Sequence, residues 1–159
     1  MDFFKQSAID MPPAASENLS VSAARNRITG CCQALGRAVD ERLSADKILL
    51  HFHDPLIRIR KVLIGVENQG AIVSFTVSSA VKLPAKQAPA AVLGHLLLRN
   101  GEQSAVWRIS IGDDDQVSFV LGYRVPAAAL APSLFKMLCE NMVKEVHVFD
   151  AKMHEAGLI

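Results

Sequence analysis

The sequence has no large excess of charge of either sign. Its 159 residues include 17 lysines and arginines and 16 aspartates and glutamates, which gives a formal net charge of +1. Proteins that bind nucleic acid or anionic membranes through bulk electrostatics carry a strong positive excess. We therefore expect neither nucleic acid nor a membrane as a partner, although a local basic patch is compatible with this balance.

Cysteine is scarce, and long apolar runs are missing. The three cysteines, Cys31, Cys32 and Cys139, are odd in number and two are adjacent, which does not suit a disulfide framework. The best apolar run, residues 61–66, is far too short to span a bilayer. Residues 1–6 contain no basic segment leading into an apolar run, so we expect no signal peptide. Together these features predict a soluble, cytoplasmic protein.

The motifs that usually announce an enzyme are also missing. The sequence contains no dinucleotide-binding glycine motif, phosphate-binding loop, nucleophile elbow or Cys-x-x-Cys pair. The acidic run Asp113, Asp114 and Asp115 lacks the ligand spacing of a calcium loop and suits a charged hairpin turn. We therefore assign no catalytic residue, no metal and no cofactor, and we predict that the protein is not an enzyme.

Two sets of residues that include histidines are candidate sites. His51 and His53 are two residues apart, so they share one face of a strand and could ligate zinc or iron if a third ligand joined them; solvated histidines at a strand edge are the simpler interpretation. His147, Asp150 and His154 share one side of a helix and could form a ligand trio or an acid/base set, whereas a solvated polar face is again simpler.

Hydrophobic periodicity predicts the element order α-βββ-α-ββ-α. The expected helices cover residues 20–44, starting at Ser20 or Ser22, then residues 90–98, ending at Asn100 and Gly101, and finally residues 132–155. The expected strands cover residues 48–53, 57–66, 73–78, 107–111 and 117–125, with a bulge or two-sided burial near Lys61. The first three strands should form an antiparallel meander.

These elements predict one α+β domain over residues 20–159, preceded by a flexible lead of residues 1–19. Helices should cover one face of an antiparallel sheet of about five strands. The other face would carry small and basic side chains, among them Arg108 and Arg124, joined by Arg58 and Arg60 if the bulge follows Arg60. Such a face suits either plain solvation or docking of an acidic or extended partner.

The short helix over residues 90–98 is apolar nearly all round, which predicts burial or an interface. Its candidate contact residues are Val92, His95 and Leu96. This helix is the first place in the sequence to seek a partner surface.

The element order resembles that of the type III secretion chaperone-like superfamily, which includes the YbjN-type bacterial proteins. Residues 92–101 (VLGHLLLRNG) resemble its short helix ending in an asparagine, residues 117–126 (VSFVLGYRVP) its following strand, and residues 134–153 its closing helix. The resemblance implies a small cytoplasmic bacterial protein that binds other proteins, is often a homodimer and catalyses nothing. Because secretion chaperones proper are acidic and this chain is not, the YbjN-type branch is the closer analogy.

The leading hypothesis is a non-enzymatic protein-interaction module, chaperone-like or regulatory, that binds a partner polypeptide as a homodimer. Its candidate contact residues are Val92, His95, Leu96, Arg108 and Arg124. The alternatives are a small-ligand-binding domain, with a pocket between the sheet and the helices, and a metal site or enzyme built on His51 and His53.

Overall fold

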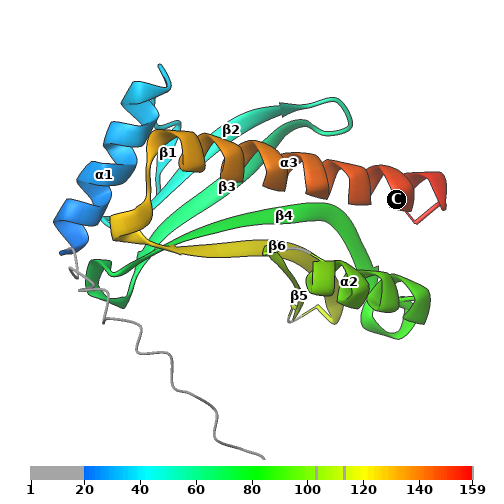
Figure 1. The fold of residues 1–159 in the computed structure, drawn as a ribbon. Helices are drawn as coiled ribbons and strands as arrows, with labels where there is room; N and C mark the ends of the chain where they lie inside the picture. Colours follow the sequence, from blue (N-terminus) through cyan, green and yellow to red (C-terminus); the bar gives the residue numbers. More distant parts are fainter. Residues whose placement is uncertain (1–19, 103, 113, 159) are drawn as a thin grey trace, which may run out of the picture.

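The protein folds as a six-stranded antiparallel sheet with its helices on one face, as Figure 1 shows for this computed structural model. The structure describes residues 20–102, 104–112 and 114–158, so the predicted lead of residues 1–19 lies outside the described residues. The helices are α1 (Val21–Ala34), α2 (Ala90–Glu102) and α3 (Pro132–Glu155). The strands are β1 (Glu41–Arg42), β2 (Lys47–Asp54), β3 (Arg58–Glu67), β4 (Ile72–Pro84), β5 (Val106–Ile111) and β6 (Gln116–Pro126), in the spatial order β1-β2-β3-β4-β6-β5. The α+β class and the element order are therefore confirmed, with one short extra strand, β1.

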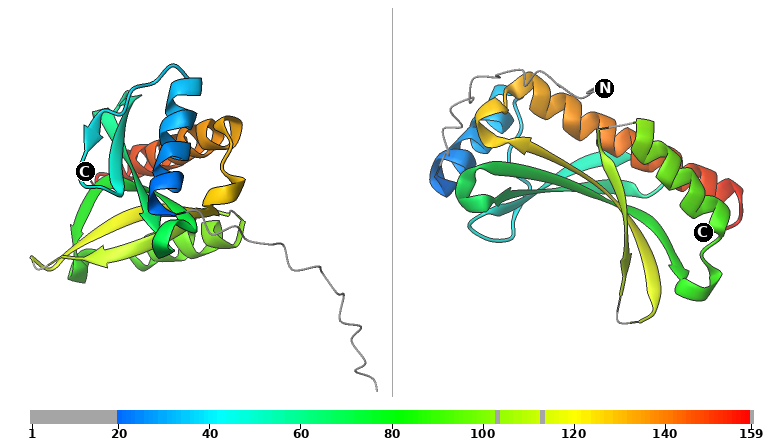
Figure 2. Two further views of the ribbon diagram at one scale, coloured as in Figure 1. Left: turned by 90° about the vertical axis from the view of Figure 1, so that its left-hand side faces the viewer. Right: turned by 60° about the horizontal axis from the view of Figure 1, so that its bottom comes forward.

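The sheet is amphipathic because its strands alternate. In β4, Val73, Phe75 and Val77 are fully buried, whereas the side chains between them are not. This buried face packs against α1 and α3, and the described part of the chain places no helix on the opposite face, which we call the open sheet face. The sheet twists strongly, so the β5–β6 hairpin projects from the body of the molecule (Figure 2).

The first helix is shorter than predicted. Its start is as expected, with the Ser20 hydroxyl accepting a hydrogen bond from the N–H of Ala23 at 3.2 Å. It ends at Ala34, because Gly36 adopts a left-handed backbone with φ of +65°. The expected continuation to residue 44 was wrong: the apolar spacing persists to Leu43, but Leu43 is 54% exposed and follows β1.

The antiparallel meander of β2, β3 and β4 is confirmed by continuous registers between neighbouring strands. The predicted bulge near Lys61 was wrong, since β3 pairs without a break with β2 over residues 58–65 and with β4 over residues 62–67. The alternative, burial on both sides of the strand, occurs slightly farther along, where Ile64, Gly65 and Val66 are consecutive buried residues. The bulge lies in β4, where Ser78 pairs with Val120 and Lys82 with Ser118. Four positions along β4 thus correspond to two along β6.

The second helix runs past its predicted stop. It continues through Asn100 and Gly101 to Glu102, and Asn100 has a tertiary role instead of ending the helix. Its side-chain oxygen accepts a hydrogen bond from the N–H of Trp107 at 2.6 Å, and its amide donates to the Trp107 carbonyl at 3.0 Å. Asn100 therefore occupies part of the outer edge of β5, the last strand of the sheet.

The long closing helix α3 has the predicted bounds. Its Phe149 packs against Trp107 of β5 and Phe119 of β6, with ring centroids 4.8 and 5.4 Å apart. An ion pair between Arg99 and Glu145 further joins α2 to α3. No helix in the described segments has the length and apolarity that crossing a membrane requires.

Candidate functional site

The two histidines of β2 point to the open sheet face, as their spacing predicted. His51 Nε2 lies 2.8 Å from Glu41 Oε1, and Lys61 Nζ reaches the same oxygen at 2.8 Å. Hydrogen bonds from Lys61 outweigh the cost of desolvation and lower the pKa of Glu41. His53 is exposed. Within the residues that the structure describes, no three His, Cys, Asp or Glu side chains come together in a way that could hold a metal ion.

The three candidate residues of α3, which are His147, Asp150 and His154, lie in different environments. Asp150 is fully buried and faces the sheet, whereas His154 is exposed at the end of the helix. His147 is half-buried, and its Nδ1 lies 3.2 Å from Oδ1 of Asp54, the last residue of β2. The structure thus does not assemble His147, Asp150 and His154 into one site.

A buried guanidinium lies at the centre of these contacts. Arg60 is 1% exposed; its Nε donates to Asp54 Oδ2 at 2.6 Å and its Nη2 to Asp150 Oδ2 at 2.8 Å. Asp150 also accepts hydrogen bonds from the Ser79 hydroxyl and, at 2.9 Å, from the N–H of Ala80. We call Arg60, Asp54 and Asp150 the buried ion network.

The expectation that Arg60 would lie on the open sheet face was wrong. It depended on a bulge after Arg60, and β3 has none. Without a bulge, Arg60 alternates in phase with Val62 and Ile64, both fully buried, and must point to the helix side. This phase was a signal in the sequence that could have placed Arg60 correctly. The network joins β2, β3, the β4 bulge and α3, so its evident role is structural.

The carboxyl of Asp54 is held ionised in this setting. Burial opposes its ionisation, but hydrogen bonds from Arg60 and from the backbone N–H groups of Leu56 and Ile57 outweigh burial and lower the pKa of Asp54 to about 2. Beside His147 the surface has a hollow of about 300 Å³, lined in part by Asp54, His53 and Lys144. Asp54 is thus the member of the buried ion network that lines this hollow.

The cysteines are not poised for nucleophilic chemistry. All three are buried and free. Burial raises the pKa of the Cys139 thiol to about 12 and also raises the pKa values of Cys31 and Cys32. A thiol with such a pKa stays protonated at neutral pH and is a poor nucleophile.

The apolar helix α2 divides its side chains between the core and solvent. Val92 and Leu96, two of the predicted contact residues, are buried within the chain at 7% and 4% exposure. His95 is exposed, and Leu97 and Leu98 are 72% and 71% exposed. Only the latter three are accessible to a partner.

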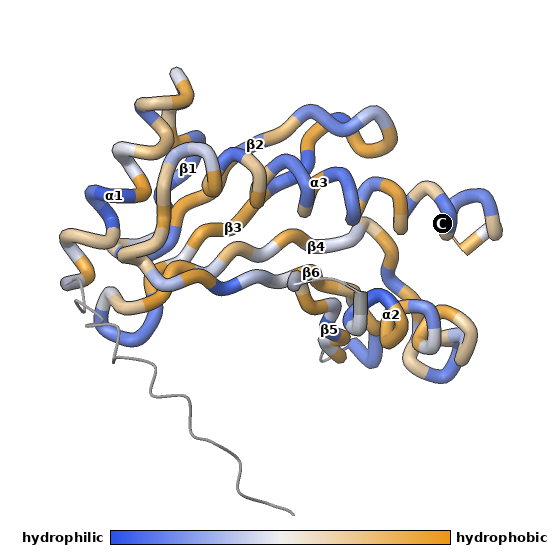
Figure 3. Tube along the Cα trace, viewed as in Figure 1, coloured by the Kyte–Doolittle hydropathy of each residue, from blue (hydrophilic) through white to orange (hydrophobic). Residues whose placement is uncertain are grey.

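A second group of exposed apolar residues lies on β5, which α2 contacts. Ile109 and Ile111 are 47% and 65% exposed, and β5 is an edge strand whose free side carries the Asn100 contact at Trp107. We call Leu97, Leu98, Ile109 and Ile111 the α2–β5 patch. Figure 3 shows that this end of the molecule carries several strongly hydrophobic residues.

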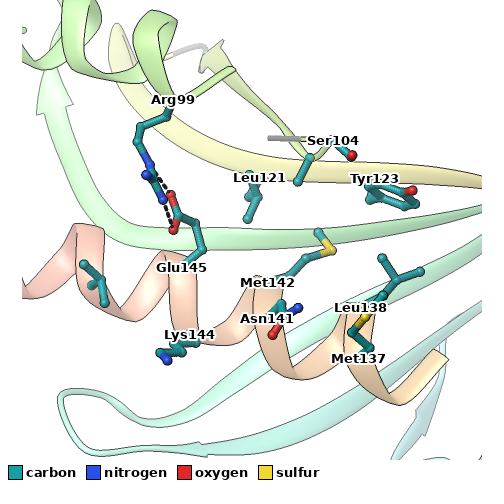
Figure 4. A pocket seen from close by; sticks show the side chains of 12 residues that line it. Arg99, Ser104, Leu121, Tyr123, Met137, Leu138, Asn141, Met142, Lys144 and Glu145 are labelled. Carbon is teal, nitrogen blue, oxygen red and sulfur yellow. Dashed lines mark hydrogen bonds and ion pairs between the residues drawn. The ribbon is translucent and has the colours of Figure 1, made fainter. Parts of the chain in front are cut away.

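A hollow of about 560 Å³ lies between α3 and β6 (Figure 4). Leu121 and Tyr123 of β6 face Met137, Leu138 and Met142 of α3 across it. Arg99 and Glu145 close one end with two hydrogen bonds of 2.9 and 2.6 Å. Methionine side chains adapt to different bound shapes, so this α3–β6 pocket could accept an apolar group.

Arg108 and Arg124 lie elsewhere, on the open sheet face. Arg124 Nε forms an ion pair with Glu67 Oε2 at 3.0 Å. The Arg108 guanidinium lies over Gly122, where a Cβ atom would be only 2.8 Å from its Nη2. The five predicted contact residues therefore occupy three settings: the core, the outer side of α2 and the open sheet face.

Comparisons with known proteins give a structural match only. No family model and no curated protein sequence matches this chain. Among solved structures, the chain is similar to YbjN from E. coli, described as a proposed transcription regulator. The TM-score is 0.61 at 13% identity, over 84% of this chain and 93% of that one. At this identity the similarity shows the fold, which is the YbjN-type fold that the sequence resembled.

Proposed function

We propose that this chain, with its YbjN-type fold, is a non-enzymatic protein-interaction module that works as a homodimer and binds a partner polypeptide. The observation that carries the proposal is the α2–β5 patch, where four large aliphatic side chains are each 47% or more exposed. Exposed large apolar side chains on two elements that contact each other, as α2 and β5 do, are typical of protein–protein contacts. The YbjN comparison supports the fold on which the patch is built, and the protonated Cys139 thiol is consistent with a role other than catalysis.

The patch suits a contact with a second copy of the chain. It combines one helix with one edge strand, and a two-fold axis through it would place each patch against its twin. We expect replacement of Leu97 and Leu98 by aspartate to make the protein monomeric, because charges would be buried at the centre of the interface. Light scattering across micromolar concentrations, with circular dichroism to verify folding, measures this.

Leu43→Asp is the matched control, since Leu43 is also about half exposed but lies beside β1. It should leave the dimer intact. A native chain that remains monomeric at high micromolar concentration would remove the homodimer from the proposal.

A second candidate function is binding of a small apolar ligand. Trp107 is 5% exposed, and its Nε1 has no hydrogen-bond partner among the described residues. It lines a hollow of about 210 Å³ that shares Arg99, Glu145 and Val148 with the α3–β6 pocket. A ligand with an apolar tail and a hydrogen-bond acceptor would fit both features.

Trp107 is the only tryptophan of the chain, so its fluorescence reports on this region. If the pocket binds such a ligand, titration with dodecanoate should change the emission saturably. The change should weaken in Met137→Lys, which places a charge at the pocket wall, and persist in Lys136→Gln, at the neighbouring exposed position. Emission that does not respond to dodecanoate would count against this candidate.

A further inference from the structure

The open sheet face carries an uncompensated positive charge. Strand side chains that point to it include five lysines and arginines: Lys47, Lys61, Lys82, Arg108 and Arg124. Among the described strand side chains on this face, two are carboxylates, and both are engaged: Glu41 with Lys61 and His51, and Glu67 with Arg124. Lys47, Lys82 and Arg108 have no ion-pair partner among the described residues. The face therefore differs from the chain as a whole, which is nearly neutral.

The cationic groups surround a low central area. Ser74, Thr76 and Ser78 of β4 lie beside Arg124, Gly122 and Val120 of β6 in the strand register. Small side chains there leave the surface flat, and Gly122 lets the Arg108 guanidinium lie across β6. The Arg108 guanidinium lies over Gly122, which pairs with Val106 of β5. Arg124 is two residues farther along β6 on the same face, so the two arginines lie in the same region of the open sheet face.

From this positive charge and the flat central surface we propose that the open sheet face binds an acidic segment of a partner polypeptide in extended form. The inference rests on the proposed function and names the class of partner. The Arg108 guanidinium has free donors for a carboxylate, and arginine binds carboxylates with two parallel hydrogen bonds. Lys82 adds a second free cation next to Ser118, one position along the face from Arg108.

A polypeptide fits this face better than nucleic acid does. Proteins that bind single strands use exposed aromatic side chains for stacking, whereas the aromatic residues of β4, β5 and β6 all point to the helix side. Aliphatic side chains, among them Leu63, Val106 and Val120, lie between the cationic ones. An acidic segment with occasional apolar residues would satisfy both kinds of group.

The test uses the full chain and a repeating Glu-Ser peptide labelled with a fluorophore, followed by fluorescence anisotropy. We expect saturable binding that weakens as salt is added, since exposed charges are screened. Replacing Arg108 and Lys82 together by glutamine should weaken binding about tenfold or more. Gly122→Ala should also weaken it without any change in charge, because the new methyl group displaces the Arg108 guanidinium.

The matched control replaces Lys136 and Lys152 by glutamine. These lysines are exposed on α3, so this double variant has the same net charge as the Arg108 and Lys82 double variant, with the open sheet face unchanged. It should bind the peptide as the native chain does. An equal loss in both double variants would show a non-specific charge effect and overturn the proposal.

Two other outcomes also overturn it: no binding of the Glu-Ser peptide, or tighter binding of a labelled DNA duplex than of the peptide. The dimer measurement is independent of these results, because the Leu97 and Leu98 variant concerns the α2–β5 patch. A dimer that does not bind the acidic peptide would reject this inference and leave the proposed function in place. If the acidic peptide binds and the chain is a monomer, the homodimer would be rejected and this inference would stand.

Discussion

Replacing Arg60 by methionine is expected to lower the free energy of unfolding by about 3–5 kcal/mol, because it leaves two buried carboxylates without their shared cation. The side chains of Asp54 and Asp150 are both fully buried, so water cannot compensate for the lost guanidinium. Urea unfolding followed by circular dichroism measures the change. Arg60→Lys retains the positive charge but lacks the planar guanidinium that reaches both carboxylates. Its free energy of unfolding should therefore lie between those of the native chain and Arg60→Met.

Lys61→Met is the matched control for this prediction. Lys61 is the next residue of β3, 53% exposed, and its ion pair with Glu41 is at the surface. Surface ion pairs contribute little, so we expect a loss below about 1 kcal/mol. If Arg60→Met cost no more than Lys61→Met, the buried ion network would not hold α3 on the sheet as described. Adding Asp54→Asn and Asp150→Asn to Arg60→Met should restore part of the stability, since no unpaired charge would then be buried.

The second large effect is a loss of stability in acid. The pKa of Asp54 is about 2 in the folded protein, below its ordinary value of 3.8. A lowered pKa stabilises the folded state above pH 3.8, and this contribution, about 2.5 kcal/mol, is lost as the pH falls through 2. Unfolding measured from pH 5 down to pH 2.5 should therefore show a steeper loss for the native chain than for Asp54→Asn, by about 1.5 kcal/mol.

Asp54→Asn is itself expected to be less stable at neutral pH, because Arg60 then lacks one of its carboxylates. The informative quantity is therefore the slope of the unfolding free energy against pH, in which native chain and variant differ at position 54 alone. Glu155→Gln, at an exposed position near the end of α3, should keep the native slope. Equal slopes in all three proteins would contradict the role assigned to Asp54.

The parts of the fold that sequence predicted well are those where one local pattern acts alone. Strand β2 and the first half of β4 alternate cleanly, and α3 repeats its apolar residues at helical spacing over its whole length, so these elements were predicted. The continuation of β4 to Pro84 was missed. The end of α1 was missed because two local signals disagree. The apolar spacing continues to Leu43, but Gly36 takes a backbone conformation that ends the helix.

The candidate sites depended on information that no local pattern contains. Asp150 was noted for its neighbours along α3, yet its partners Arg60 and Ser79 are distant in sequence. Val92 and Leu96 were expected at an interface, but only the path of α2 beside Trp107 determines which side of the helix is buried. The basic character of the open sheet face was partly predicted from Arg108 and Arg124. The absence of a described ion-pair partner for Lys82, and the position of the Arg108 guanidinium over Gly122, depend on the tertiary structure and could not be predicted.

The bulge in β4 also bears on how this chain can change during evolution. Between Ser78 and Lys82 the strand holds two residues more than its neighbour β6, and an even insertion leaves the inward and outward sides unchanged. Losing one residue there would turn Val81 and Leu83 out of the core and Lys82 into it. Related proteins with this fold should therefore lengthen or shorten this strand two residues at a time, and in those without the insertion an aspartate at the position of Asp150 would keep its contact with Arg60 but lose the hydrogen bonds from Ser79 and Ala80.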